Sequence, residues 1–176
     1  MRKLFLLRGA PGSGKSSFIA RHHLTPYAIS RDQIRLLLAD LTVYYQEDAD
    51  VLHQVIPRHV TVRTEQMVDH LVEHKMEHGE TVIVDGTHIV PSAIEHFKPW
   101  VDKYHYECFV VDLMQHNTLE NLLKRNQTRM HYDWVKPEVV KQMYRSYEAH
   151  PEVPSWAHKI IPTQMDHALS QKESNL

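Results

Sequence analysis

The stretch RGAPGSGKSS, residues 8–17, decides the fold of this chain. It contains Gly9-x-x-x-x-Gly14-Lys15-Ser16, the spacing of a phosphate-binding loop. Glycines let consecutive backbone N–H groups approach phosphate oxygens, because no Cβ stands in the way. A helix that starts directly after such a loop adds the positive end of its dipole. The alternative, a flexible surface turn, needs neither a strand before it nor a helix after it.

The flanking sequence supplies that strand and that helix. Leu4-Phe5-Leu6-Leu7 is a continuous apolar run, typical of a strand buried on both faces of a parallel sheet. Residues 16–22 are expected to begin a helix. We therefore predict that the loop binds a nucleoside triphosphate, with Lys15 at the β- and γ-phosphates and the Ser16 hydroxyl on Mg²⁺. The expected contacts with the nucleotide are made by Gly9, Ala10, Pro11, Gly12, Ser13, Gly14, Lys15, Ser16 and Ser17.

Composition and length are those of an ordinary soluble protein. The chain has 176 residues, of which 42% are hydrophobic and 24% charged, so one domain over residues 1–162 and a tail over 163–176 are expected. The apolar run that ends at Arg8 is too short for a signal peptide, and no segment reaches the length of a membrane span. A single cysteine, Cys108, lies in an apolar run and is expected to be a buried thiol. We expect a cytoplasmic protein.

Charge is unevenly distributed along the chain. The net charge of −2 argues against a protein that coats nucleic acid non-specifically. Residues 124–145 nevertheless hold six Lys or Arg against two acidic residues, whereas residues 47–80 hold eight acidic residues against three Lys or Arg. A local basic surface of this kind can bind a ligand that carries phosphate.

Strand and helix patterns alternate along the sequence, which is the signature of an α/β fold. Besides residues 4–7, strands are expected at 27–29, 81–84, 106–113 and 158–161. Helices are expected at 16–22, from residue 30, at 51–56 up to Pro57, and then at 58–79, 91–103, 118–129 and from 137. Residues 40–49 look like an excursion from this pattern. The prediction is a P-loop fold with a five-stranded parallel sheet, helices on both faces, a helical lid, and ligands at the carboxyl ends of the strands.

The stretch SRDQIR offers one candidate site. Ser30-x-x-Gln33 is a capping box, which places Asp32 in the first turn of a helix and Arg35 on the same helix face. One interpretation is an acid favoured by the helix dipole that pairs with an arginine. The other makes Asp32 the general base for an incoming hydroxyl group and Arg35 the residue that holds the acceptor.

Two further stretches carry candidate residues. Asp85 follows four apolar residues, so it is expected at the strand edge beside the phosphate loop, where it can assist Mg²⁺ through water or hold an arginine. Its alternative is a turn cap with Thr87. Arg125 and Arg129 lie four residues apart at the end of a helix. They either compensate the helix dipole or belong to a lid that closes over the transferred phosphate.

Taken in order, these stretches resemble the kinase module of bacteriophage-type 5′-polynucleotide kinases and their bacterial RNA-repair relatives. The resemblance covers most of the chain and is carried by GAPGSGKS (9–16), SRDQIR (30–35), VIVDGTH (82–88), LLKRNQTR (122–129) and VVKQMYRSYE (139–148).

The resemblance implies a role for each matching residue. Asp32 is the general base, and Arg35, supported by Asp85, contacts the phosphate next to the acceptor hydroxyl. Arg125 and Arg129 belong to a lid over the donor phosphates, and Lys15 and Arg129 act in catalysis. The implied cofactors are ATP and Mg²⁺, and the implied acceptor is the 5′-OH end of RNA or DNA.

Two other functions remain open at this point. Small-molecule kinases similar to zeta toxins and antibiotic phosphotransferases use a comparable loop and catalytic aspartate. A non-catalytic nucleotide-binding module would also keep the loop, but it has no need of Asp32 beside Arg35. Transfer of labelled phosphate to a panel of hydroxyl acceptors separates the three.

Overall fold

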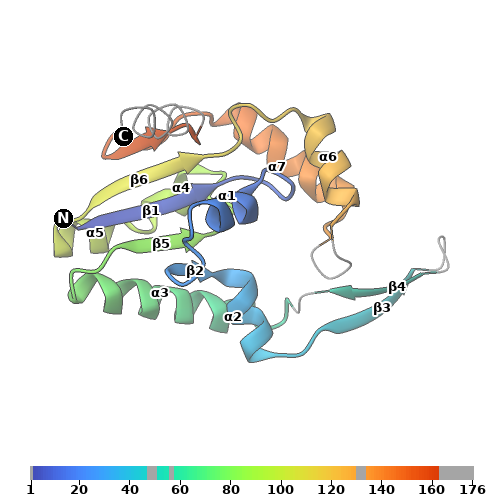
Figure 1. Cartoon of the computed structure of the whole chain (residues 1–176), viewed down its shortest axis with the longest axis horizontal. Helices are drawn as coiled ribbons and strands as arrows, with labels where there is room; N and C mark the ends of the chain where they lie inside the picture. The colour runs from blue at the N-terminus through green and yellow to red at the C-terminus, as the bar shows by residue number, and fades with distance from the viewer. Residues whose placement is uncertain (1, 47–50, 56–57, 130–133, 163–176) are drawn as a thin grey trace, which may run out of the picture.

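The computed structural model describes residues 2–46, 51–55, 58–129 and 134–162 (Figure 1). The expected tail over residues 163–176 lies outside the described residues. In chain order the elements are β1 (Lys3–Arg8), α1 (Lys15–Arg21), β2 (Ala28–Ser30), α2 (Arg31–Leu38), β3 (Thr42–Gln46), β4 (Val51–Val55), α3 (Thr61–Glu77), β5 (Val82–Asp85), α4 (Pro91–Glu95), α5 (Lys98–Tyr104), β6 (Glu107–Asp112), α6 (Leu119–Gln127), α7 (Pro137–Ala149) and β7 (Ala157–Ile160).

Five parallel strands form the main sheet in the order β2-β5-β1-β6-β7. β1 lies at its centre, where Leu6 is in register with Val84 of β5 and with Val110 of β6. Leu4 and Leu6 are completely buried, as expected of a strand that is covered on both faces. The parallel sheet and its crossover helices confirm the predicted α/β fold.

Helices cover both faces of this sheet. α1 packs on one face, where Phe18 and Ile19 contact Leu7 and Val111. α3, α4 and α5 bury their apolar side chains on the opposite face, and Figure 1 accordingly shows α1 in front of the sheet and α4 behind it. A third apolar cluster joins α6 and α7 to Ala10 of the phosphate loop. The lid candidates on α6 are thereby brought beside that loop.

The prediction of a helix over residues 51–56 is wrong. Val51–Val55 forms β4, which pairs antiparallel with β3 to make a separate two-stranded sheet. Figure 1 shows this hairpin extending away from the main sheet. Both segments are rich in valine, threonine or tyrosine, which suit a strand once a partner strand is present. Within the excursion predicted for residues 40–49, Thr42–Gln46 forms the first strand of this hairpin, and residues 47–49 lie outside the described residues.

The single helix expected over residues 91–103 is two helices, α4 and α5. Pro99 explains the break. It has no N–H to donate, and its ring would collide with the carbonyl group of Glu95, four residues earlier in a continuous helix. The first turn of a new helix tolerates proline, and Pro99 occupies that turn of α5.

The cysteine agrees with the sequence prediction. Cys108 is 1% exposed, and burial raises the pKa of its thiol to about 12. Among the described residues, no helix has both the length and the apolar character that a membrane crossing requires.

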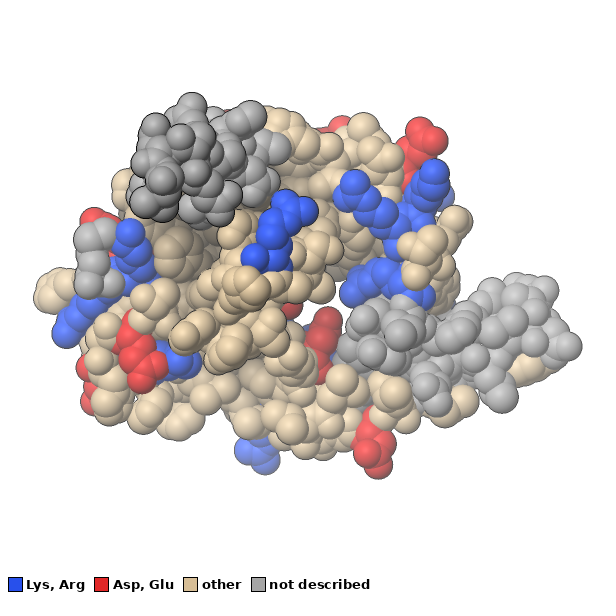
Figure 2. All heavy atoms as spheres, in the orientation of Figure 1, with Lys and Arg blue, Asp and Glu red and all other residues tan. Residues whose placement is uncertain are grey.

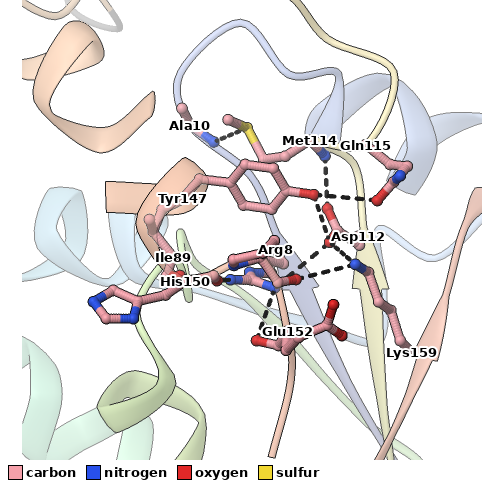
Figure 3. A network of polar contacts seen from close by, with 11 residues as sticks. Arg8, Ala10, Ile89, Asp112, Met114, Gln115, Tyr147, His150, Glu152 and Lys159 are labelled. Carbon is pink, nitrogen blue, oxygen red and sulfur yellow. Dashed lines mark hydrogen bonds and ion pairs between the residues drawn. The ribbon is translucent and has the colours of Figure 1, made fainter. Parts of the chain in front are cut away.

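A buried polar network joins the end of β1 to the C-terminal part of the chain (Figure 3). The Arg8 guanidinium donates to the carbonyl oxygens of Ile89 at 2.8 Å and Pro151 at 2.9 Å. It also lies 3.5 Å from the Asp112 carboxylate and 4.8 Å from the centre of the Tyr147 ring. The Tyr147 hydroxyl donates to Asp112 at 3.1 Å. Because a buried charge is costly without its partners, these contacts hold α7 and the following loop against the strand that leads into the phosphate loop.

Candidate active site

Steric and conformational demands account for the glycines of the phosphate loop. A Cβ on Gly9 would lie 2.1 Å from the Ser13 hydroxyl oxygen, and one on Gly12 would lie 2.6 Å from the carbonyl oxygen of Leu122. Gly12 and Gly14 have φ angles of 83° and 98°, in the region that side chains disfavour. Gly14 is also the N-cap of α1, so the loop runs directly into the helix.

Neighbouring segments hold the loop in place. The Gly9 N–H donates to the carbonyl oxygen of Thr87 at 2.9 Å, which connects the loop to the segment that follows β5. The Asn117 side-chain amide donates to the carbonyl oxygen of Ser13 at 3.2 Å, which connects it to the segment that follows β6. The loop therefore lies at the carboxyl ends of the central strands, the edge that the sequence pattern indicates.

The Lys15 ammonium lies across the loop and near the candidate acids. It donates to the carbonyl oxygens of Gly9 at 2.8 Å and Ala10 at 3.2 Å. Burial lowers the pKa of Lys15 below its usual value, whereas the charges of Asp85 and Asp32 oppose this effect. Lys15 is therefore close enough to Asp85 and Asp32 for their charges to act on its pKa. Its contact with donor phosphates stays a prediction.

Asp32 and Asp85 come together because their strands pair. Ser30 at the end of β2 is in register with Asp85 at the end of β5. Asp32 follows Ser30 by two residues, in the first turn of α2, and the Ser30 hydroxyl accepts a hydrogen bond from the Gln33 N–H at 3.5 Å. Burial raises the pKa of Asp85, the Asp32 charge adds to this, and Lys15 opposes it.

Arg35 contacts Asp32 directly. Its Nη1 lies 2.7 Å from the Asp32 carboxylate, while the Asp32 side chain stays 54% exposed. The Nε of Arg35 is buried and has no hydrogen-bond partner within the part of the chain that the structure describes. The helix ion pair expected from the sequence is present, and the same pair lies beside the phosphate loop. The Asp32 carboxylate of this pair is open to a hydroxyl group.

Arg125 and Arg129, the candidates for a lid, are arranged differently from the sequence prediction. α6 ends at Gln127, so Arg129 lies beyond the helix rather than one turn after Arg125 on it. Arg125 donates to the carbonyl oxygen of Gly12 at 3.4 Å, on the rim of the phosphate loop. The charge of Arg129 lowers the pKa of Lys15 and opposes the rise in that of Asp85. Arg125 therefore contacts the rim of the loop, and Arg129 is near enough for its charge to act on Lys15 and Asp85.

A cavity of about 320 Å³ adjoins the start of α1. It is lined by Gly14, Ser17, Phe18, Arg21, Leu113, Arg125 and Pro162. Figure 2 shows a hollow right of centre, with Lys and Arg atoms above it over α1 and α6 and Asp or Glu atoms at its lower side. The hollow in Figure 2 thus has basic atoms on one side and acidic atoms on the other, whereas the lining of the 320 Å³ cavity includes two arginines and no acid.

The residues present suit a nucleoside triphosphate with magnesium. α1 has no side-chain cap and no acid in its first turn, so nothing on this helix competes with a phosphate for its N-terminal N–H groups. The exposed Ser16 hydroxyl and the carboxylates of Asp32 and Asp85 are oxygen ligands, which Mg²⁺ prefers. ATP would supply the transferable phosphoryl group, and Mg²⁺ would neutralise charge on it.

Two residues of the site had no role in the sequence prediction. Arg31, which precedes Asp32, bonds to Glu65 on α3 and to the ring of His88. Arg31 lies in SRDQIR and His88 in VIVDGTH, two of the stretches that carry the family resemblance, and this is the sequence signal that could have identified them. Only the three-dimensional structure shows that they meet, because 57 positions separate them.

The parallel sheet and the phosphate loop together define a P-loop domain of the α/β class. The family model described as an AAA domain matches residues 4–150, so the chain belongs to this family. No curated protein sequence matches the chain closely enough to count as a relative.

Solved structures share the fold. A chain in the structure of the Pnkp1/Rnl/Hen1 RNA repair complex matches with a TM-score of 0.66 at 21% identity, over 85% of this chain and 45% of that chain. The present chain therefore spans less than half the length of that protein. A provisionally assigned kinase from Chloroflexus aurantiacus matches with a TM-score of 0.66 at 16% identity, over 99% and 98% of the two chains. A gluconokinase from Sinorhizobium meliloti matches with a TM-score of 0.50 at 15% identity, over 91% and 82%.

Proposed function

We propose that residues 1–162 form a kinase domain that transfers the γ-phosphate of ATP to the 5′-hydroxyl end of a polynucleotide. The observation that carries this proposal is the Asp32–Arg35 pair, 2.7 Å apart and beside Lys15. A proton acceptor and a phosphate-binding cation are thereby one helical turn apart. The fold shared with a chain of an RNA repair complex supports the same acceptor class.

The reaction needs a base, charge neutralisation and alignment. Asp32 accepts the proton of the 5′-hydroxyl as its oxygen forms the new bond to the γ-phosphorus. The bond from that phosphorus to the bridging oxygen breaks, and ADP leaves with the electron pair. Lys15 binds the β- and γ-phosphates, and Arg129 neutralises charge on the transferred group. Arg125, at the rim of the loop, holds the donor phosphates.

Arg35 selects the acceptor. The feature that distinguishes a 5′-hydroxyl end is the phosphate on the 3′ side of the first nucleotide. The Arg35 guanidinium has five N–H donors, and its contact with Asp32 uses Nη1. The remaining donors suit a phosphate, which arginine binds in a bidentate manner. Together, Asp32 and Arg35 select an acceptor whose hydroxyl and phosphate lie a fixed distance apart, and this selection does not require a large basic surface.

The second candidate is phosphorylation of a small hydroxyl compound. Two observations favour it: the fold shared with a gluconokinase over 91% of this chain, and the net charge of −2. In that case Arg35 would bind a carboxylate or phosphate of the small acceptor. ATP and Asp32 would keep the same roles.

Transfer of labelled γ-phosphate tests the two candidates directly. We expect phosphorylation of 5′-OH oligonucleotides and of nucleoside 3′-monophosphates, but not of nucleosides that lack the 3′-phosphate. Arg35→Ala should abolish this preference, because the residue proposed to bind the 3′-phosphate is then absent. Arg63→Ala, an exposed arginine on α3, is the matched control and should behave like the wild type.

The other outcomes are equally informative. Transfer to gluconate, another sugar or an antibiotic, with none to 5′-OH ends, would overturn the polynucleotide proposal in favour of the second candidate. ATP binding without transfer to any acceptor would instead indicate a nucleotide-binding module.

A further inference from the structure

Arg31 connects the helix that carries Asp32 to a second helix. Its Nε donates to both carboxylate oxygens of Glu65 on α3 at 3.0 Å. The Arg31 side chain is 18% exposed and that of Glu65 is 38% exposed, so solvent screens this pair only in part. Because Arg31 is the first residue of α2, the contact holds the start of that helix and not its far end.

The other side of Arg31 reaches the central strand through His88. The Nδ1 of His88 lies 2.7 Å from the carbonyl oxygen of Leu7. A carbonyl only accepts, so Nδ1 carries the proton and Nε2 presents a lone pair. That lone pair accepts from Arg31 Nη1 at 3.2 Å. Burial lowers the pKa of His88 to about 3, and the Arg31 charge adds to this, which keeps the ring neutral and able to accept.

The residues between Asp85 and His88 make this arrangement possible. A Cβ on Gly86 would lie 2.0 Å from Arg31 Nη1 and 2.8 Å from the His88 ring, so a side chain there would exclude the guanidinium. The carbonyl oxygen of Thr87 accepts from the Gly9 N–H at the start of the phosphate loop. One short segment therefore contacts the phosphate loop and supports the helix of the candidate base.

We propose that Arg31 and His88 are positioning residues, which hold Asp32 at a fixed place relative to the phosphate loop. The links run from Asp32 through Arg31 and His88 to Leu7, two residues before Gly9. Neither residue acts on the substrate itself. This inference rests on the proposed function, because it assumes that Asp32 must be aligned with the donor phosphate. Misplacement of a reacting group by roughly 1 Å costs about 10²-fold in rate, so alignment of this kind is measurable.

Steady-state kinetics of Arg31→Gln and Glu65→Gln test the proposal. For Arg31→Gln we expect kcat for transfer to a 5′-OH oligonucleotide to fall about 10²-fold, with KM for ATP changed only a few-fold. Glu65→Gln should show a smaller loss of the same kind. We expect kcat of the double variant to be no lower than that of Arg31→Gln alone, because both substitutions break the same contact between Arg31 and Glu65. Arg63→Gln on the exposed face of α3 is the matched control and should leave kcat unchanged.

Wild-type kcat in Arg31→Gln, with only a lower melting temperature, would overturn the proposal and leave Arg31 a purely structural residue. If Arg31→Gln does not fold, Glu65→Gln decides between the same two outcomes. Gly86→Ala, which displaces the Arg31 guanidinium, should reproduce the kcat loss of Arg31→Gln.

A second measurement separates this inference from the proposed function. If the wild type phosphorylates no 5′-OH end, the proposed function fails, and hydrogen exchange of residues 28–38 in the ATP–Mg²⁺ complex still tests the positioning. Faster exchange in Arg31→Gln than in the wild type supports it. Equal exchange overturns it.

Discussion

The carboxylate of Asp32 is held on one side and open on the other. Arg35 lies 2.7 Å from one of its oxygens, yet the side chain is 54% exposed. An acid that only balanced the helix dipole would have no reason to share its surroundings with Lys15 and Asp85, as Asp32 does. This exposed carboxylate is the proton acceptor in the reaction that we propose.

Asp32→Asn isolates that proton acceptor. The amide keeps the size of the side chain but has no carboxylate to take a proton. We expect kcat to fall about 10²–10⁴-fold while KM for ATP changes little. Asp102→Asn, which removes the carboxylate of an exposed helix ion pair with Lys98, is the matched control. Activity within a few-fold of the wild type would transfer the role of the base to another residue, with Asp85 the first candidate.

Motifs made some residues of the site predictable and left others out. Gly9, Lys15 and Asp32 could be placed from the sequence because their spacing to a strand end or a helix start fixes their position. Arg31 and His88 could not, because their contact depends on how β2 pairs with β5. Spacing along the chain carries no information about such a contact.

Local sequence also decided which elements were predicted correctly. The helix expected over residues 58–79, the strands of the main sheet and the Ser30 cap all follow from short-range patterns, and the structure confirms them, with that helix present as α3. The β3–β4 hairpin depends on pairing between two short segments, each of which is ambiguous alone. The break between α4 and α5 was predictable in principle, since Pro99 alone explains it.

Close contact between the phosphate loop and α6 leads to a prediction for Gly12. Gly12→Ala places a methyl group 2.6 Å from the Leu122 carbonyl oxygen and forces a side chain into a φ of 83°. We expect weaker ATP binding by titration calorimetry, and a loss of stability beyond the roughly 1–2 kcal/mol that the backbone conformation alone costs.

Gly79→Ala is the matched control for this prediction. Gly79 has a φ of 72°, but its nearest neighbour would be the flexible Arg2 side chain at 3.5 Å, far from the loop. The Gly79→Ala variant should lose only the stability that a side chain at positive φ costs, and it should keep its affinity for ATP. If both variants lose the same stability and both bind ATP normally, the steric argument for Gly12 is wrong.

At the scale of the whole molecule, the sheet brings together residues from separate parts of the sequence. The central strand β1 pairs with β5 and β6, so the segments that follow all three meet at one edge. Arg8 and His88 then join the strands to α7 and α2 through buried polar contacts. The sequence predicted the parallel sheet, but the contacts of Arg8 and His88 depend on the order of its strands, which the sequence did not predict.

His88 makes global stability depend on pH in a direction that can be stated. Its pKa falls from the usual 6.5 to about 3, because it is buried and faces the positive charges of Arg31 and Lys15. Between these two values the unfolded chain binds the proton that the folded protein excludes. The contribution of His88 is therefore complete above pH 6.5 and is lost as pH falls toward 3, at up to about 1.4 kcal/mol per pH unit.

Urea unfolding of the wild type and of His88→Gln between pH 7 and 5 measures this contribution. The other titratable groups are common to both proteins, including Asp85 with its raised pKa, so the difference in slope belongs to His88. We expect the unfolding free energy of the wild type to decrease more steeply on acidification, whatever the absolute stability of the variant. Equal slopes would mean that His88 takes up its proton as readily in the folded protein as in the unfolded chain. In that case its Nε2 could not be a permanent acceptor for Arg31, and the link from the central strand to the candidate base would fail with it.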